Sequence, residues 1–321
     1  MQGVGRCAVA QAAVAVDLGG TWIRAGRVSP EGAVMEAVRV PTPQTGPEAV
    51  ADAIGELVRR LGPLPPGRVG VAVPGPLSVR EGVVFEPPNL KGWRDVPLRG
   101  MLEERLGRPV VLENDANAAA VGEWWCGAGR GSRHLVYVTV STGVGGGLVL
   151  DGRLYRGATD TAGEIGHVLV DPEGPVCSCG RRGHLEGIAS GPAIARWVQE
   201  RIREGRPSVL ATGRPFSARE VAEAAEAGDA LAREAFERAG RYLGWTVAGL
   251  LNLVNPEVVV IGGGVARAGR WLFDPLREAA REASFERPWQ AARIVPAALG
   301  DRAGLVGAAY VAMEEGGISG G

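Results

Sequence analysis

A glycine-rich hairpin that occurs twice is the feature that most constrains the fold of this chain. In the first copy, VAV and WIRAGRV flank the turn DLGGT, and the copy spans residues 14–32. In the second, LVYVTV and LVL flank the turn STGVGGG, and the copy spans residues 135–157. Each copy leads into alternating helical and strand patterns. A duplication on this scale predicts two similar α/β domains, which we place at residues 1–133 and 134–321.

The apolar patterns that follow each hairpin predict the remaining elements. Helical periodicity covers residues 47–61, 98–107, 229–254 and about 304–315. Buried strands are expected in RVGVAVPGPL, PVVLEN, PEVVVIGGGV and ARIVPA. The stretch from about 158 to 215 has no counterpart in the first half, so we expect an insertion there. We expect the last helix to pack back on the first domain.

Composition and charge exclude several classes of protein. The chain has 321 residues, 45% of them apolar, and a net charge of −1, which is typical of a globular protein and gives no footprint for nucleic acid or membrane. No apolar run reaches the length of a bilayer span.

Lys91 is the only lysine, which excludes a G-x-x-x-x-G-K phosphate loop. The four cysteines form no disulfide framework and indicate a reducing cytoplasm.

The apolar run CAVAQAAVAV at the N-terminus has two interpretations. Because Arg6 precedes it, residues 7–16 could belong to a signal peptide. The run leads directly into the DLGGT turn, however, and cleavage would remove the first core strand. We therefore favour the strand.

The glycine turns predict phosphate binding. Gly19 and Gly20 allow backbone N–H groups to approach phosphate oxygens, and Thr21 adds a hydroxyl. A plain hairpin turn is the alternative. The second copy, with Thr142 and Gly143, favours a pair of turns that clamp a polyphosphate. A nucleoside would lie near the glycines that end a later apolar strand, although these could also form a simple strand-to-helix turn; they are Gly262, Gly263 and Gly264.

Three polar residues end the strand PVVLEN. Glu113, Asn114 and Asp115 follow VVL directly, and we expect them to project from the strand end rather than to lie in the core. Capping of the next helix by Asn114 or Asp115 is one explanation. The functional hypothesis is a general base that accepts a proton from a substrate hydroxyl.

The insertion contains a spacing typical of a metal site. His167, Cys177, Cys179 and His184 supply four nitrogen and sulfur ligands, which suit tetrahedral Zn²⁺. A redox pair or unliganded thiols are the alternatives. Since residues 167–184 contain little that could form a core, we predict a structural zinc that folds this loop. We expect zinc loss to weaken substrate binding at the loop and to leave nucleotide binding at distant glycine turns nearly normal.

Together these motifs are similar to those of the ROK family of sugar kinases and repressors, within the actin-like sugar kinase superfamily. They occur in the family's order along nearly the whole chain: DLGGT, VPGPL, PPNLKGW, LENDANAAAVGEWWCGAG, STGVGGGLVLDG, AGEIGH, CSCGRRGHLEGIASG, NPEVVVIGGGV and LGDRAGLVGAA. The resemblance implies an α/β fold of two actin-like, ribonuclease H-like domains. It also implies a cleft between them and a zinc-binding insertion in the second.

The resemblance assigns roles to individual residues. It implies that Asp115 is the catalytic base, and that Asp17 holds Mg²⁺ through water. It implies that ATP is bound by Asp17, Gly19, Gly20, Thr21, Thr142, Gly143, Gly262, Gly263 and Gly264. It implies that the sugar is bound by Gly75, Asn89, Asn114, Asp115, Glu164, His167 and Glu186. One departure is His184, where the family commonly has cysteine, but imidazole is an equally acceptable zinc ligand.

The activity implied is ATP-dependent phosphorylation of a hexose at its 6-hydroxyl, with glucose as the first choice. Mannose, N-acetylmannosamine, fructose and allose are alternatives, as are ADP or polyphosphate as donor. The family's repressors carry a helix-turn-helix domain before the first hairpin, where this sequence has about 13 residues; we therefore expect a kinase. The implied partner is a small-molecule hexose, with no nucleic acid or membrane, in a homodimer or homotetramer.

Overall fold

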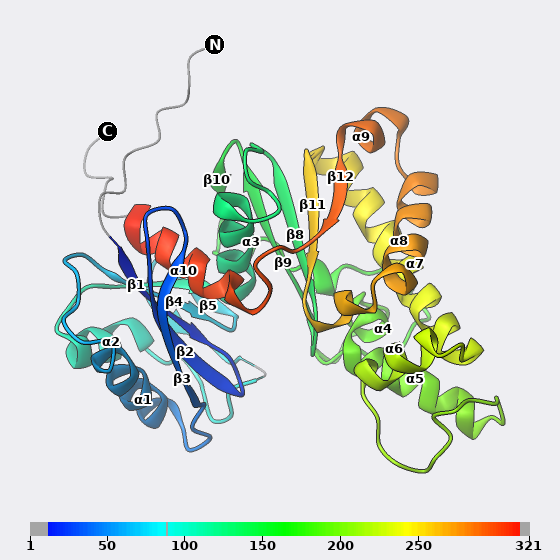
Figure 1. The fold of residues 1–321 in the computed structure, drawn as a ribbon, viewed down its shortest axis with the longest axis horizontal. Coiled ribbons are helices and arrows are strands. Elements are labelled where there is room, and N and C mark those ends of the chain that lie inside the picture. The colour runs from blue at the N-terminus through cyan, green and yellow to red at the C-terminus, as the bar shows by residue number, and fades with distance from the viewer. Residues whose placement is uncertain (1–11, 88, 315–321) are drawn as a thin grey trace. The chain divides into compact units, whose positions relative to one another are not determined.

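A computed structural model describes residues 12–87 and 89–314, so the first half of the run weighed as a signal peptide, residues 7–11, lies outside the described residues. The chain divides into two compact units. Unit 1 comprises Met1–Gly131, Leu154–Ala162 and Asp301–Gly321, and unit 2 comprises Ser132–Arg153 and Gly163–Gly300. Each unit contains an α/β fold around its own five-stranded sheet (Figure 1).

The sheet of unit 1 is mixed, with the strand order β3-β2-β1-β4-β7. Strand β2 pairs antiparallel with both β1 and β3, whereas β1, β4 and β7 are parallel to one another. The elements of this unit are β1 (Ala13–Leu18), β2 (Trp22–Val28), β3 (Val34–Pro41), α1 (Pro47–Arg59), β4 (Val69–Val73), β5 (Leu77–Ser78), β6 (Val83–Val84), α2 (Leu98–Leu106), β7 (Val110–Asn114), α3 (Asp115–Cys126) and α10 (Ala303–Glu314).

The sheet of unit 2 repeats this topology in the order β10-β9-β8-β11-β12. Again one hairpin, β8 with β9, is antiparallel, and β8, β11 and β12 are parallel. Its elements, with the short 3₁₀ helices, are β8 (Leu135–Val140), β9 (Val144–Leu150), η1 (Ile165–His167), α4 (Glu186–Ala189), α5 (Gly191–Arg203), α6 (Ala218–Glu226), α7 (Ala230–Val254), β11 (Val258–Gly262), η2 (Gly264–Ala268), α8 (Arg270–Ala283), α9 (Glu286–Ala291) and β12 (Arg293–Pro296). Strand β10 (Arg153–Leu154) and η3 (Gly300–Arg302) begin in unit 2 and end in residues of unit 1.

The two faces of β1 explain how helices cover the sheet of unit 1. Val14, Val16 and Leu18 pack in one core with α1 and α2, while Ala13 and Ala15 pack in a second with α3 and α10. This alternation follows from the two-residue period of a strand. Because the second face carries small residues, α10 approaches the sheet closely. A Cβ on Gly70 would lie only 2.0 Å from the carbonyl oxygen of Ala308.

Unit 2 has one continuous core, in which helices cover strands β8 and β11. Phe236 and Leu243 of α7 are fully buried there with Leu272 and Leu276 of α8. The long α7 lies along α8 (Figure 1). None of the helices within residues 12–87 and 89–314 is long and apolar enough to cross a membrane.

Candidate active site and metal centre

The first glycine turn is held by residues just beyond strand β3. The Gly19 N–H donates to the Trp22 carbonyl at 3.0 Å. The Thr42 hydroxyl donates to the Gly19 carbonyl at 2.6 Å, and the Gln44 amide donates to the Gly20 carbonyl at 3.1 Å. The turn's carbonyls therefore face the sheet edge.

Asn89, which the sequence predicts to bind sugar, lies against this turn. A Cβ on Gly20 would be 3.0 Å from the Asn89 carbonyl oxygen, so a larger residue at position 20 would push the Asn89 loop away. A predicted phosphate residue and a predicted sugar residue are thus neighbours in unit 1.

Asp17 ends strand β1 in a poorly hydrated position. Its side chain is 16% exposed, and one carboxylate oxygen lies 3.3 Å from the Arg24 guanidinium. A Cβ on Gly304, at the start of α10, would lie 3.1 Å from the other. Desolvation raises the pKa of Asp17, and Arg24 partly opposes this shift. A carboxylate in this setting would gain from a hydrated cation, so Asp17 fits the predicted Mg²⁺ role.

The junction of β7 and α3 carries the predicted base. Asn114 is the helix N-cap, and its side-chain oxygen accepts from the N–H groups of Ala116 and Asn117 at 2.9 and 3.1 Å. Capping is therefore confirmed for Asn114. Asp115 is the first residue of α3, half-buried, where the helix dipole favours the ionised carboxylate that a general base requires. A Cβ on Gly75 would lie 2.8 Å from the Asn114 amide nitrogen, so these two predicted sugar residues are adjacent.

The expectation that Glu113 avoids the core is wrong. Its side chain is 1% exposed, and it pairs with Arg156, whose Nη2 and Nε lie 2.7 and 2.8 Å from one carboxylate oxygen. Asn117 donates to the other oxygen at 3.1 Å. Burial raises the pKa of Glu113, and Arg156 opposes this shift. Sequence reasoning missed Arg156 because the Leu154–Ala162 segment returns to unit 1 from a distant point in the chain.

The second glycine turn is held differently. The Ser141 N–H donates to the Gly143 carbonyl, and the Gly191 N–H donates to the Ser141 carbonyl, both at 2.8 Å. The Val144 N–H donates to the Glu186 carboxylate at 3.0 Å. A Cβ on Gly143 would lie 2.6 Å from the same carboxylate oxygen, so only glycine permits this approach.

The predicted adenosine glycines adjoin this second turn. Gly263 has a φ of +86°, which favours glycine, and a Cβ there would be 2.2 Å from the Val140 carbonyl oxygen. A Cβ on Gly264 would approach the Ser141 hydroxyl at 3.9 Å. Both glycines are exposed. Strand β11 therefore ends beside the turn with a surface of bare backbone.

The four predicted metal ligands come together. One ligand atom from each of His167, Cys177, Cys179 and His184 lies within 4.8 Å of the others. The Sγ of Cys179 is 3.2 Å from Nδ1 of His184, and the Sγ of Cys177 is 3.7 Å from Nδ1 of His167. Tetrahedral zinc with bonds of about 2.0–2.3 Å requires ligand separations of roughly 3.3–3.8 Å. Burial lowers the pKa of His184, which favours the neutral imidazole that a metal needs. The donor set therefore suits Zn²⁺; two of the ligand pairs lie close to these separations, and the four atoms together span up to 4.8 Å.

Two carboxylates surround this cluster. Glu164 lies 3.9 Å from Nε2 of His167, the nitrogen that faces away from Cys177. Glu186 accepts a hydrogen bond from the Ser178 hydroxyl, and the same oxygen is 3.4 Å from the Cys177 sulfur. The metal loop is therefore joined to the second glycine turn through Glu186. The expectation that the loop is distant from the glycine turns is wrong for this turn.

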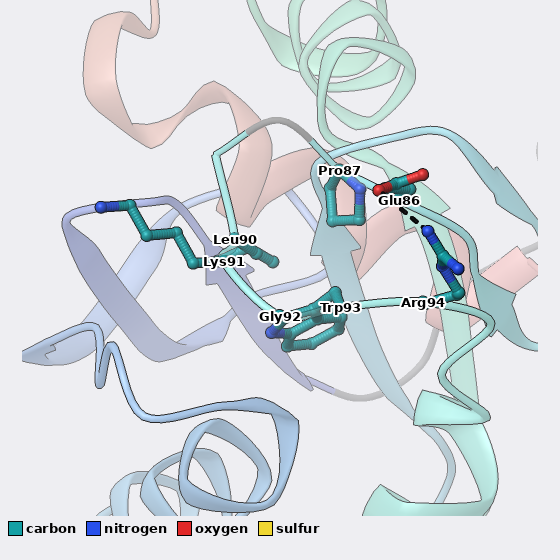
Figure 2. A pocket seen from close by; sticks show the side chains of 7 residues that line it. All are labelled: Glu86, Pro87, Leu90, Lys91, Gly92, Trp93 and Arg94. Carbon is teal, nitrogen blue, oxygen red and sulfur yellow. Dashed lines mark ion pairs between the residues drawn. The ribbon is translucent and has the colours of Figure 1, made fainter.

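A surface hollow lies beside the loop that carries Asn89. The hollow has a volume of about 400 Å³. Figure 2 shows the residues that line it: Glu86, Pro87, Leu90, Lys91, Gly92, Trp93 and Arg94. Trp93 is buried, and the Lys91 side chain extends away from the other lining residues. The lining contains none of the predicted site residues, so the predicted site and this hollow are different places.

Comparisons with known proteins place the chain in a family. The model of the ROK family matches residues 13–315, and the chain belongs to the ROK family. It is 40% identical to a glucokinase of Thermotoga maritima, over 94% of this chain and 97% of that protein.

Two solved structures share the fold. A ROK family glucokinase from Streptomyces griseus, in complex with glucose and AMPPNP, is 37% identical with a TM-score of 0.82, covering 94% of this chain and 99% of that one. A ROK family transcriptional regulator, a homologue of the E. coli MLC protein, is 28% identical with a TM-score of 0.87, covering 96% of this chain and 80% of that one. The α/β fold with mixed sheets is thus that of ROK sugar kinases.

Proposed function

We propose that this protein is an ATP-dependent glucokinase that transfers a phosphoryl group to the 6-hydroxyl of glucose. The observation that carries the proposal is the match, over nearly the whole of both chains, to a glucokinase solved with glucose and AMPPNP, an ATP analogue. The position of Asp115 at the start of α3, beside the Asn114 cap, supports it with a chemical group suited to the reaction.

In this proposal the protein's part in phosphoryl transfer is positioning and charge stabilisation. Asp115 accepts the proton of the sugar hydroxyl. Sugar hydroxyls are bound by Gly75, Asn89, Asn114, Glu164, His167 and Glu186. Backbone N–H groups and hydroxyls of the two glycine turns hold the phosphates, and Gly262, Gly263 and Gly264, of which the last two are exposed, accommodate adenosine. Mg²⁺, held by Asp17 through water, would neutralise phosphate charge, and Zn²⁺ would fold the loop 167–184.

The finer fold assignment belongs to the same proposal. The chain would consist of two actin-like, ribonuclease H-like domains, at about residues 1–133 and 134–321, each contributing residues to substrate binding. The repeated strand order supports this assignment. We also infer a cytoplasmic homodimer or homotetramer, which light scattering of the purified protein would test.

A ROK-type regulator is the second candidate, because the fold also matches a transcriptional regulator. The two candidates differ in chemistry. A regulator requires sugar binding but no turnover, whereas a kinase consumes ATP in proportion to the sugar phosphorylated.

The deciding experiment is a coupled assay with Mg²⁺-ATP and a panel of glucose, mannose, N-acetylmannosamine, fructose and allose. We expect the highest kcat/KM for glucose and lower turnover with ADP or polyphosphate as donor. A kcat/KM ten times higher for another hexose would show that glucose is the wrong substrate, while the assignment as a kinase would stand. Sugar binding without product would favour the regulator.

A further inference from the structure

Glu186 contacts both the metal loop, residues 167–184, and the second glycine turn. One carboxylate oxygen accepts from the Ser178 hydroxyl and contacts the Cys177 sulfur, inside the loop. The other accepts from the Val144 N–H in the second glycine turn. One half-buried side chain thus joins the predicted metal site to the predicted phosphate site within unit 2.

We propose that Glu186 is a positioning residue for the second glycine turn, and that zinc in the loop strengthens nucleotide binding through it. The inference rests on the proposed function, since it concerns the nucleotide of that reaction. The inference goes beyond the proposed function because it couples the metal site to the nucleotide site, and neither site implies this coupling by itself.

The surroundings of Glu186 explain why the metal should control its position. Cys177 lies beside its carboxylate, while Ser178, Cys179 and Gly180 are exposed and pack against little. Without a cation, two thiols and two imidazoles have no common partner, and the loop has little core of its own to replace it. Ser178 and Cys177 would then no longer fix the Glu186 carboxylate.

The turn depends on Glu186 in the same way. The Val144 N–H needs a hydrogen-bond acceptor, and the Glu186 carboxylate supplies it. At this partly buried site, water would replace the carboxylate poorly. Gly143 leaves space for the carboxylate, because any side chain there would collide with it. A turn that loses this acceptor rearranges its N–H groups, which are the groups predicted to bind phosphate.

This role is compatible with sugar binding by the same residue. A carboxylate offers about four lone-pair positions. The Ser178 hydroxyl and the Val144 N–H occupy two of them, so a sugar hydroxyl can still donate to Glu186. The coupling to nucleotide must therefore be measured without sugar.

The test measures the affinity of the zinc-containing protein for Mg²⁺-AMPPNP by calorimetry, before and after zinc is removed with a zinc-selective chelator. We expect zinc removal to weaken binding about tenfold in the wild type, the scale of one charge-assisted hydrogen bond. In Glu186→Ala, binding should be weak already, zinc content should stay at one per chain, and zinc removal should change the affinity less than twofold.

Three further variants separate positioning from general damage, all measured with zinc bound. Glu186→Gln keeps a neutral acceptor without the charge and should recover part of the affinity lost in Glu186→Ala. Ser178→Ala removes only the bond inside the loop and should weaken binding about threefold. Glu173→Ala is the matched control, an exposed acid of the same loop, and should bind as the wild type does.

Three results would overturn the inference: unchanged affinity after zinc removal, normal affinity in Glu186→Ala, or equal losses in Glu173→Ala and Glu186→Ala. A protein that binds AMPPNP independently of zinc would contradict the coupling and leave the glucokinase proposal standing. A protein that binds no AMPPNP at all would contradict both.

Discussion

The two glycine turns occupy equivalent places in the two sheets, yet different residues hold them. The first turn uses Thr42 and Gln44, which follow the eight-residue strand β3. The equivalent strand in unit 2, β10, has two residues, after which the chain leaves for unit 1. Strand β10 is therefore too short to support the second turn in the way that β3 leads to Thr42 and Gln44. Glu186 from the insertion accepts the supporting hydrogen bond instead. The first turn is thus supported by residues of its own unit's sheet edge, and the second depends on a loop that we propose zinc to fold.

The parallel strands of the two sheets also end in different residues. Strand β7 ends at Asn114, and Asp115 opens a helix whose dipole favours a carboxylate. Its counterpart β12 ends at Pro296. Strand β4 ends before Pro74, whereas β11 ends at the buried Gly262 and is followed by two exposed glycines. The duplicated scaffold therefore carries the predicted base in unit 1 and exposed glycine backbone at the corresponding region of unit 2.

The largest expected effect tests the assignment of the reactive group to unit 1. Asp115→Asn keeps the size of the side chain and removes the base, so kcat should fall by about 10²–10⁴-fold. The affinities for glucose and AMPPNP should change little, which steady-state kinetics and calorimetry would show. Near-normal turnover in this variant would contradict the role.

A second prediction compares how each unit packs its helices. A Cβ on Gly307 of α10 would lie 1.6 Å from the Ala118 carbonyl oxygen, and one on Gly244 of α7 would lie 2.4 Å from that of Leu276. Alanine should destabilise by about 3 kcal/mol or more at Gly307 and about 1–3 kcal/mol at Gly244. Urea denaturation would measure both losses.

The control for this pair is Gly249, also in α7. Among the described residues, no heavy atom beyond its own helix and chain neighbours lies within 4 Å of a Cβ placed there. Alanine at that position should stabilise by about 1 kcal/mol through helix propensity. Equal losses at Gly249 and Gly244 would show that backbone crowding is not the cause.

A smaller effect is expected at the first turn. Thr42→Val removes the hydroxyl bonded to the Gly19 carbonyl and keeps the buried shape of the side chain. AMPPNP binding should weaken about fivefold, the scale of one neutral hydrogen bond. Because Thr42 belongs to unit 1, the factor should be the same with and without zinc. If the loss of affinity in Thr42→Val changed with zinc, the proposed difference between the two turns would be wrong.

Local patterns predicted much of this fold. The two-residue alternation around DLGGT and STGVGGG located both hairpins, and the spacing of His167, Cys177, Cys179 and His184 predicted a cluster that does form. These features depend on neighbours in the sequence. The helix periodicity likewise located α1, α7 and α10 to within two residues at each end.

Contacts between distant segments could not be predicted in the same way. The polarity of Glu113 predicts a position outside the core, because its partner Arg156 lies 43 positions away in the sequence. The family motif assigns Glu186 to the sugar site, because its bond to Val144 spans 42 positions and leaves no local signal. Buried charge and turn support depend on which segments meet, which a single sequence pattern does not contain.

The most direct test of the difference between the turns is amide hydrogen exchange of the zinc-containing and zinc-free protein. The account predicts that exchange over residues 141–145 becomes about tenfold faster without zinc, as the bond from Val144 to Glu186 weakens. Residues 17–21, supported by Thr42 and Gln44, should exchange at the same rate in both forms. Equal acceleration in both turns, or none in either, would contradict the account.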